Sequence, residues 1–446
     1  MRPTAHTKSP ILFVVAAAFL VADFPAPAAL AAGEEHSMMV TVGPAEADVI
    51  GTENVAIQKA VDQVAAAGGG TVLIKAGTYT LSNSVRLASH VSLKGEGPGK
   101  TILMKGPGVK SRLAVDADYG EFQATVEDAS GFAPGMGVTV VDKDHRSGWY
   151  PSVRTIVRIE ANTLFFDRYL HLDYLVENDG EVFNAFPLIA GYEVEGVTVS
   201  DLTADGNRKA TEILDGCQAG AIYFYHSKNF RIRGCVARNF AGDGISTQFV
   251  ENPVIENCEA FGNAYLGIHL GTGAKGGTVR HNRSHDNGQV GLFLCWRVQH
   301  GRFEQNQCWG NGEYGISIGH KDTDNVFVRN TVSGNGLAGV VFRNETESNA
   351  GHRNAFIENT IEDNGRPGTP GYGVRIEGAT RDIRLESNII RDTRPDGRNT
   401  QHVGLYIGPQ ADSISAKKNI FSTNLKRAIV DESTGGHNDV DQPTFP

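Results

Sequence analysis

A repeat of 24 residues constrains this chain more than any other feature of its sequence. From Gly220 onward a glycine opens each short alternating strand, and the series continues at Gly244, Gly267, Gly291, Gly315, Gly339, Gly373 and Gly404. The steps between these glycines are 24, 23, 24, 24, 24, 34 and 31 residues. Such a repeat accommodates strands of about five residues and tight turns but no helix. We therefore predict a β-solenoid whose rungs stack ~4.8 Å apart.

Two asparagine columns keep the same register as the glycines. One column contains Asn239, Asn263, Asn287, Asn311, Asn335 and Asn364. The other contains Cys235, Cys258, Asn282, Asn306, Asn330, Asn359 and Asn388. Stacked amides can hydrogen-bond along a column and satisfy polar groups that the turns bury. We expect each opening glycine to provide a backbone conformation that is closed to residues with a Cβ atom.

The alternation within each strand separates an inward set from an outward set of side chains. The predicted core contains Ile245, Ile268, Leu292, Ile316 and Val340, followed two positions later by Leu270, Leu294, Ile318 and Phe342. The predicted outward positions are Ser246, His269, Phe293, Ser317, Val341 and Arg375. The solenoid should therefore have a continuous apolar core and one polar outer face.

The rest of the chain divides around this solenoid. Arg2 and Lys8 flank the start of an apolar run from Ile11 to Ala22, and Ala29-Leu30-Ala31 offers a cleavage site, so we predict a signal peptide and a secreted or periplasmic protein. Residues 54–67 carry a helical apolar stripe that should cap the solenoid, since an end rung must shield its core. The expected organisation is a signal peptide (1–31), a cap with the first coils (40–111), a β-rich antiparallel insertion (112–190), the solenoid body (191–425) and a C-terminal tail (426–446).

Charge and cysteine content exclude several classes of function. The formal net charge is −10 with dispersed Lys and Arg, so we expect no binding to nucleic acid and, after signal cleavage, none to membranes. The five cysteines are an odd number and none has zinc-ligand spacing. Cys235 and Cys258 share a column, and we favour buried free thiols over a disulfide there.

The N-terminal sequence resembles a known superfamily. AIQKAVDQVAAAGGGTVLIKAGTYTL followed by HVSLKGEGPGKTIL is similar to the opening of the pectate-lyase-like right-handed parallel β-helices, and the repeats resemble their body. The resemblance implies an all-β right-handed parallel β-helix and a polysaccharide or oligosaccharide partner. That superfamily includes lyases, hydrolases, uronate epimerases and non-catalytic surface proteins, so the fold alone does not fix the reaction.

Reactive side chains gather in the turns after three consecutive strands. The sequences CWR, GHKDTD and RNETE stand where Gly, Asn or Ser is usual, so we predict a site within about 10 Å along the stack. For β-elimination on a uronate, His320 or Lys321 would be the base, and Arg297 and Arg343 would bind the carboxylate. The predicted substrate contacts are Trp296, His269, Glu345, Asp322, Arg375 and Glu377. No cofactor should be required, although Asp322 and Glu345 could tune the base or bind Ca²⁺.

Two alternatives to a lyase stay open from the sequence. A glycoside hydrolase would need paired carboxylates, for which Asp205, Asp243, Glu345 and Glu377 are available. The stretch Tyr314 to Gly319 resembles a polygalacturonase motif, but Tyr314 replaces its histidine and Glu377 replaces the lysine of a second motif. The D-P-H signature of alginate epimerases is absent. The other alternative is a non-catalytic glycan-binding or surface protein. If the predicted cluster is only structural, Asp205, Asp243 and the Trp149-Tyr150 loop are the next candidates.

Overall fold

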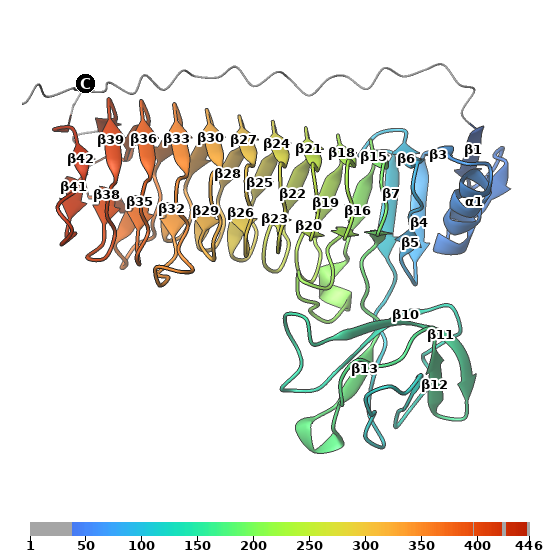
Figure 1. Cartoon of the computed structure of the whole chain (residues 1–446). Helices are drawn as coiled ribbons and strands as arrows, with labels where there is room; N and C mark the ends of the chain where they lie inside the picture. The colour runs from blue at the N-terminus through green and yellow to red at the C-terminus, as the bar shows by residue number, and fades with distance from the viewer. Residues whose placement is uncertain (1–37, 396, 422–424, 444–446) are drawn as a thin grey trace, which may run out of the picture. The chain divides into compact units, whose positions relative to one another are not determined.

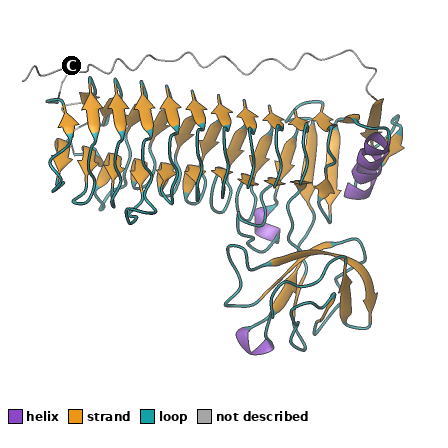
Figure 2. Ribbon diagram, in the orientation of Figure 1, coloured by secondary structure: helices purple, strands orange, loops and turns teal. Residues whose placement is uncertain are grey.

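The computed structural model describes residues 38–395, 397–421 and 425–443. The predicted signal peptide, 1–31, lies outside the described residues. Most coils contribute one strand to each of three parallel sheets, so the sheets run side by side along the stack (Figures 1 and 2). This arrangement is a parallel β-helix, as the repeat predicted.

Each of the three parallel sheets pairs its strands in a single series along the stack. The first has 14 strands: β2 (Val49–Ile50), β1 (Met38–Gly43), β3 (Gly70–Ile74), β6 (Val91–Gly95), β15 (Thr198–Ser200), β18 (Arg231–Arg233), β21 (Val254–Glu256), β24 (Thr278–Arg280), β27 (Arg302–Glu304), β30 (Val326–Val328), β33 (Ala355–Ile357), β36 (Arg384–Glu386), β39 (Ser415–Lys417) and β42 (Asp439–Val440). The second has 11: β4 (Gly77–Leu81), β7 (Thr101–Lys105), β16 (Thr203–Asp205), β19 (Val236–Arg238), β22 (Glu259–Phe261), β25 (Arg283–His285), β28 (Gln307–Trp309), β31 (Thr331–Ser333), β34 (Thr360–Glu362), β37 (Ile389–Arg391) and β40 (Ile420–Phe421). The third, which we call the site sheet, also has 11: β5 (Val85–Arg86), β14 (Ile189–Tyr192), β17 (Ile222–Tyr225), β20 (Ile245–Gln248), β23 (Ile268–Leu270), β26 (Val290–Leu294), β29 (Tyr314–Ile318), β32 (Ala338–Phe342), β35 (Gly371–Ile376), β38 (Gln401–Ile407) and β41 (Arg427–Asp431).

The predicted inward residues of the site sheet form the core. All nine are at most 1% exposed, from Ile245 to Phe342. Aromatic rings from neighbouring rungs also stack inside, with centroid distances of 4.5 Å between Phe303 and Phe327 and 4.3 Å between Phe327 and Phe356. Burying a side chain of this kind stabilises the fold by about 1.5–3 kcal/mol. The core is therefore continuous along the stack.

Both asparagine columns form hydrogen-bonded ladders. In one, each Asn side-chain oxygen accepts from the backbone N–H and the Nδ2 of the preceding rung, from Asn263 to Asn364, and Gln401 continues the series. The other runs from Asn282 to Asn419 in the same way. The assignment of Asn239 to the first column is wrong by one residue. Phe240 occupies that position and donates its N–H to Asn263, because the step there is 23 residues.

The opening glycines have a different physical role from the one predicted. Among them, Gly267 and Gly315 do not have a positive φ angle. A Cβ atom on Gly315 would lie 2.8 Å from Asn335 Nδ2 and 2.2 Å from a methyl carbon of Val332, and one on Gly267 would meet Ser284 Oγ at 1.9 Å. These positions therefore require glycine because the ladder and the neighbouring strand pass too close for any side chain.

The cap and the insertion complete the described fold. Helix α1 (Asn54–Ala66) buries the predicted apolar stripe against the first coils, which confirms the capping helix. The insertion is a six-stranded antiparallel sheet with its own core, in the order β8 (Lys110–Arg112), β13 (Glu181–Phe183), β10 (Gly137–Val141), β11 (Ser152–Glu160), β12 (Thr163–Phe166) and β9 (Gln123–Thr125). Two single-turn 3₁₀ helices lie at Val176–Asn178 and Arg208–Ala210. Strands β41 and β42 lie within the predicted tail, 426–446, and extend the sheets.

All five cysteines are free thiols in the structure. The Cys235 and Cys258 side chains are buried and contact backbone carbonyls of neighbouring rungs, Val199 and Ile232. No helix among the described residues has the length and apolarity needed to cross a membrane.

Candidate active site on the site sheet

Two adjacent turns of the site sheet have an uncommon backbone conformation. Trp296 and Arg297 follow β26 with φ angles of 60° and 68°, and His320 and Lys321 follow β29 with 44° and 66°. Single left-handed residues recur along the chain, but in its described part these are the only two consecutive pairs of non-glycine residues with positive φ. Bulky residues held in this region carry strain of about 1–3 kcal/mol each and often mark functional sites.

His320 lies at the centre of the predicted cluster. Its Nε2 is 2.9 Å from a carboxylate oxygen of Glu345, and its ring stacks on Trp296 with centroids 4.6 Å apart. Burial and the neighbouring Arg343 guanidinium lower the pKa of His320, and Glu345 only partly opposes them. The imidazole is therefore neutral near pH 7. If Nε2–H donates to Glu345, Nδ1 carries the lone pair and is the atom that can accept a proton.

Arg343 is held beside this imidazole by several contacts. It donates from Nη1 to Ser317 Oγ at 2.9 Å and from Nη2 to the Leu294 carbonyl at 2.9 Å. Its guanidinium lies 4.7 Å from the Phe293 ring centre, and its Nη2 is 3.4 Å from His320 Nδ1. Its Nε is buried without a hydrogen-bond partner in the described part of the chain. A fixed cation next to a neutral base is the arrangement that the elimination hypothesis requires.

Asp322 supports Arg343 from the interior. Its carboxylate is fully buried, lies 3.3 Å from Arg343 Nη2, and accepts the backbone N–H groups of Val298 and Gly319. Burial raises the pKa of Asp322 to about 7, against the lowering effects of Arg343 and the two N–H donors. The predicted direct contact between Asp322 and substrate does not fit this placement, because the carboxyl has no access to solvent. It holds the turn and the guanidinium in position instead.

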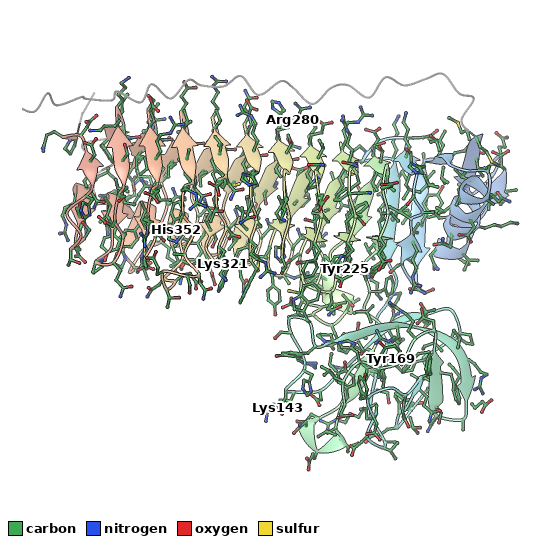
Figure 3. The ribbon with its side chains drawn as sticks, viewed as in Figure 1. Lys143, Tyr169, Tyr225, Arg280, Lys321 and His352 are labelled. Atoms are coloured by element: carbon green, nitrogen blue, oxygen red, sulfur yellow. The ribbon has the colours of Figure 1, made fainter. Side chains whose placement is uncertain are left out.

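The remaining predicted residues divide into exposed and paired groups. Arg297 and Lys321 are exposed, and neither side chain forms a hydrogen bond or ion pair with another described residue (Figure 3 labels Lys321). Arg375 and Glu377 lie one rung beyond Arg343 and form an ion pair with each other. The structure thus brings Trp296, His320, Arg343 and Glu345 into one group, which we call the His320 cluster, with two unpaired cations at its edge.

His269 lies apart from this cluster. Its ring is 97% buried and its Nδ1 is 2.8 Å from Asp243, while its Nε2 has no hydrogen-bond partner among the described residues. Burial is the largest single influence and opposes a charge on this imidazole, but the hydrogen bond and charge of Asp243 act together with Cys295 and raise the pKa of His269 to about 10. The segment around Gly216 covers the pair, since a Cβ there would meet Asp243 at 1.7 Å. His269 therefore points outward from its strand, as predicted, but has no direct access to a substrate.

A pocket lies between the insertion and the site sheet, and the Trp149-Tyr150 loop named above as a further candidate contributes Trp149 to it. It has a volume of about 350 Å³ and is lined by aromatic and basic side chains, among them Trp149, Arg154, Tyr169, Tyr192 and Tyr225. Figure 3 shows Tyr225 on the solenoid and Tyr169 in the insertion. The alternation in Ile222–Tyr225, which repeats tyrosine at every second residue, was the available signal. Nothing in the sequence indicated where the insertion would lie.

The structure offers no preformed metal centre within its described residues, where no group of three or more His, Cys, Asp and Glu side chains is placed to hold an ion. Both oxygens of Asp322 already accept hydrogen bonds, so it is poorly suited to bind Ca²⁺ together with Glu345.

Comparisons with known proteins identify the architecture. A family model described as a right-handed beta helix region matches residues 189–349. The chain is similar in structure to the A-module of the Azotobacter vinelandii mannuronan C-5 epimerase AlgE4, with a TM-score of 0.59 and 16% identity over 87% of this chain and 96% of that one. It is also similar to an exopolygalacturonase from Thermotoga maritima, with a TM-score of 0.54 and 13% identity over 88% and 87% of the two chains. A third similar structure is PfbA, a surface adhesin of Streptococcus pneumoniae, with a TM-score of 0.50 and 14% identity over 83% and 81%. A search of curated proteins finds no match. These comparisons confirm the predicted right-handed parallel β-helix fold.

Proposed function

This chain is a right-handed parallel β-helix protein, and from that premise we propose that it is an exported enzyme that cleaves a uronate-containing polysaccharide by β-elimination. The observation that carries the proposal is the His320 cluster, in which a neutral imidazole lies beside a fixed guanidinium. Two of the similar structures are named for polymers of uronic acids, mannuronan and polygalacturonate, which supports an acidic glycan as the substrate class.

The proposed reaction assigns one step to each member of the cluster. Arg343, with the exposed Arg297 and Lys321, neutralises the uronate carboxylate and thereby acidifies the proton on C5. His320 Nδ1 accepts that proton, while Glu345 holds the ring through Nε2. The C5–H electron pair forms the C4–C5 double bond, and the O4 oxygen leaves with the bonding pair and takes up a proton from water. Trp296, 42% exposed, offers a stacking face for the adjacent sugar ring.

The alternative of paired carboxylates has less support near this cluster. A hydrolase needs one carboxyl as the acid and a second as base or nucleophile. Glu345 is engaged with His320, Glu377 with Arg375, and Asp243 is buried beneath the Gly216 segment. A non-catalytic glycan-binding protein would need none of these groups to react, so it predicts binding without turnover.

The test is a panel of acidic glycans assayed in two ways. Elimination creates an unsaturated uronate that absorbs in the ultraviolet, whereas hydrolysis produces only reducing ends. We expect ultraviolet absorbance on at least one uronate polymer. We also expect His320→Ala to lower kcat about 10²–10⁴-fold. His300→Ala, at an exposed turn histidine outside the His320 cluster, should leave kcat unchanged.

Arg343 provides a second test of the same chemistry. Arg343→Ala should lower kcat/KM, and Arg343→Lys should not restore it, because an ammonium cannot reproduce the planar guanidinium contacts to Ser317 and Leu294. Reducing ends without absorbance would assign hydrolysis instead. Binding with neither signal across the panel would indicate a non-catalytic protein.

A further inference from the structure

The pocket beneath the insertion contains a buried cation that has no ion-pair partner among the described residues. Arg154, on β11, is 92% buried. It donates only to neutral groups: the carbonyls of Tyr169 and Val153, the Ser152 hydroxyl and the His171 ring. No described carboxylate lies within 4 Å of it. Burial lowers its pKa to about 10, so it remains charged at neutral pH. Buried charges in proteins are ordinarily paired, so this pocket favours an anionic ligand.

A second arginine strengthens the positive charge at the pocket. Arg168 has a half-exposed side chain that donates to the Val153 carbonyl. The nearest carboxylate to Arg168, Asp167, is 3.7 Å away and is shared with Arg86. Asp167 therefore forms its ion pairs with Arg86 and Arg168, and it acts on Arg154 only from a longer distance.

The other walls of the pocket are aromatic and come from both parts of the fold. Trp149 of the insertion lies 6.0 Å from Tyr225, and Tyr192 lies 5.8 Å from Tyr223 and 6.4 Å from Tyr225, all measured between ring centres. Amphipathic rings of this kind pack on an apolar surface while their polar atoms bond to neighbours. An anion with an apolar ring face, such as a uronate sugar, fits this combination better than an inorganic anion.

The sheet face is closed just beyond the pocket. On β5, the last strand of the site sheet at this end, Arg86 bonds to Thr155 and Asp167 of the insertion. Asn83, just before β5, bonds to the Gly135 carbonyl and to Thr155 Oγ1. A polymer that runs along the outer side of the site sheet, over the Gly216 segment that covers β20, therefore meets a wall at β5, so the end of the chain occupies the pocket.

We propose that this pocket binds the terminal uronate of the polysaccharide and sets the length of the released product. The claim about product length rests on the proposed function, because it requires cleavage. The claim that the pocket binds a uronate does not. The pocket lies over β14 and β17, and His320 follows β29, which is four strands beyond β17 in the sheet. At ~4.8 Å per strand this separation is about 19 Å, so cleavage should release an oligosaccharide of one short length.

Binding is tested first, without any requirement for cleavage. Calorimetry would use saturated oligogalacturonates and oligomannuronates of defined length, with carboxyl-reduced forms as neutral controls. We expect the acidic oligosaccharides to bind and the neutral ones to bind at least tenfold more weakly. Trp149→Ala and Arg168→Ala should each raise Kd about tenfold or more. Arg158→Ala, a matched arginine on β11 that pairs with Glu160, should not change it. Arg154→Met is informative only if its melting curve shows a folded protein, and the two exposed variants do not depend on it.

Product length is then measured on a substrate that the enzyme cleaves. Early in the reaction the wild type should release one dominant oligosaccharide, and Trp149→Ala should release a mixture of lengths. Equal binding of acidic and neutral oligosaccharides, unchanged Kd in both exposed variants, or random early products from the wild type would each overturn the proposal. If no glycan is cleaved, the proposed function fails, while the calorimetry still decides whether the pocket binds a uronate.

Discussion

Replacing Asn330 with leucine removes one link of a buried ladder whose hydrogen bonds can be counted. The Asn330 side-chain oxygen accepts from the backbone N–H and the Nδ2 of Asn306, and its Nδ2 donates to the Phe303 carbonyl and to Asn359. The Asn359 oxygen keeps a second donor, the Asn330 backbone N–H. Leucine therefore leaves the Asn306 backbone N–H and one of its two Nδ2 hydrogens unsatisfied, while Nδ2 keeps its bond to the Val279 carbonyl, at a residue that is 1% exposed. Each buried unsatisfied donor hydrogen costs about 1–3 kcal/mol, so we expect the free energy of unfolding to fall by about 2–6 kcal/mol.

The assay is chemical denaturation followed by circular dichroism, with Asn344→Leu as the matched control. Asn344 is exposed in the turn after β32 and lies outside both ladders, so the same substitution there should change stability by less than about 0.5 kcal/mol. Asn306→Leu should resemble Asn330→Leu, because it interrupts the same ladder one rung earlier. Equal unfolding midpoints for Asn330→Leu, Asn344→Leu and the wild type would refute the reasoning that the ladder stabilises the stack.

Two further predictions concern the active site and the repeat. Because Glu345 raises the pKa of His320 while burial and Arg343 lower it, Glu345→Gln should lower that pKa further. The acidic limb of the kcat–pH profile should then move to lower pH, and a limb that stayed in place would exclude His320 as the titrating base. Deleting residues 291–314 should leave a folded solenoid that lacks activity, because Asn282 and Asn287 can then meet Asn330 and Asn335 in register. A collapsed circular dichroism spectrum would contradict that expectation.

The regular parts of the fold were predictable because each residue in a column meets the same environment. The inward apolar positions and the outward set from Ser246 to Arg375 follow from a period of two within strands and from the glycine that opens each strand, with steps of 23, 24 and 34 residues between rungs. The error at Asn239 arose where one rung is a residue shorter, so equal spacing in sequence no longer meant equal height in the stack. The ladder end at Gln401 was missed because glutamine replaces the expected asparagine.

The site was predictable only as far as its residues share neighbouring rungs. Trp296, His320 and Glu345 meet because their turns stack. The position of Asp322 in the repeat could not reveal that its side chain turns inward and accepts backbone N–H groups. An inward and an outward side chain at this turn position have the same sequence spacing. The repeat also could not reveal that the segment around Gly216 covers His269, because that contact joins a loop of irregular length to the sheet.

The insertion leaves and rejoins the solenoid through two paired strands, β8 and β13, in which Arg112 lies opposite Glu181. The coils before and after the insertion still stack directly on each other, since β14 pairs with β5, β15 with β6 and β16 with β7. The entropic free energy of closing a loop rises only slowly with its length. The stability of the solenoid therefore depends little on the length of the segment between β8 and β13. Evolution can therefore exchange this segment as a cassette while the strands on either side of it keep their pairing.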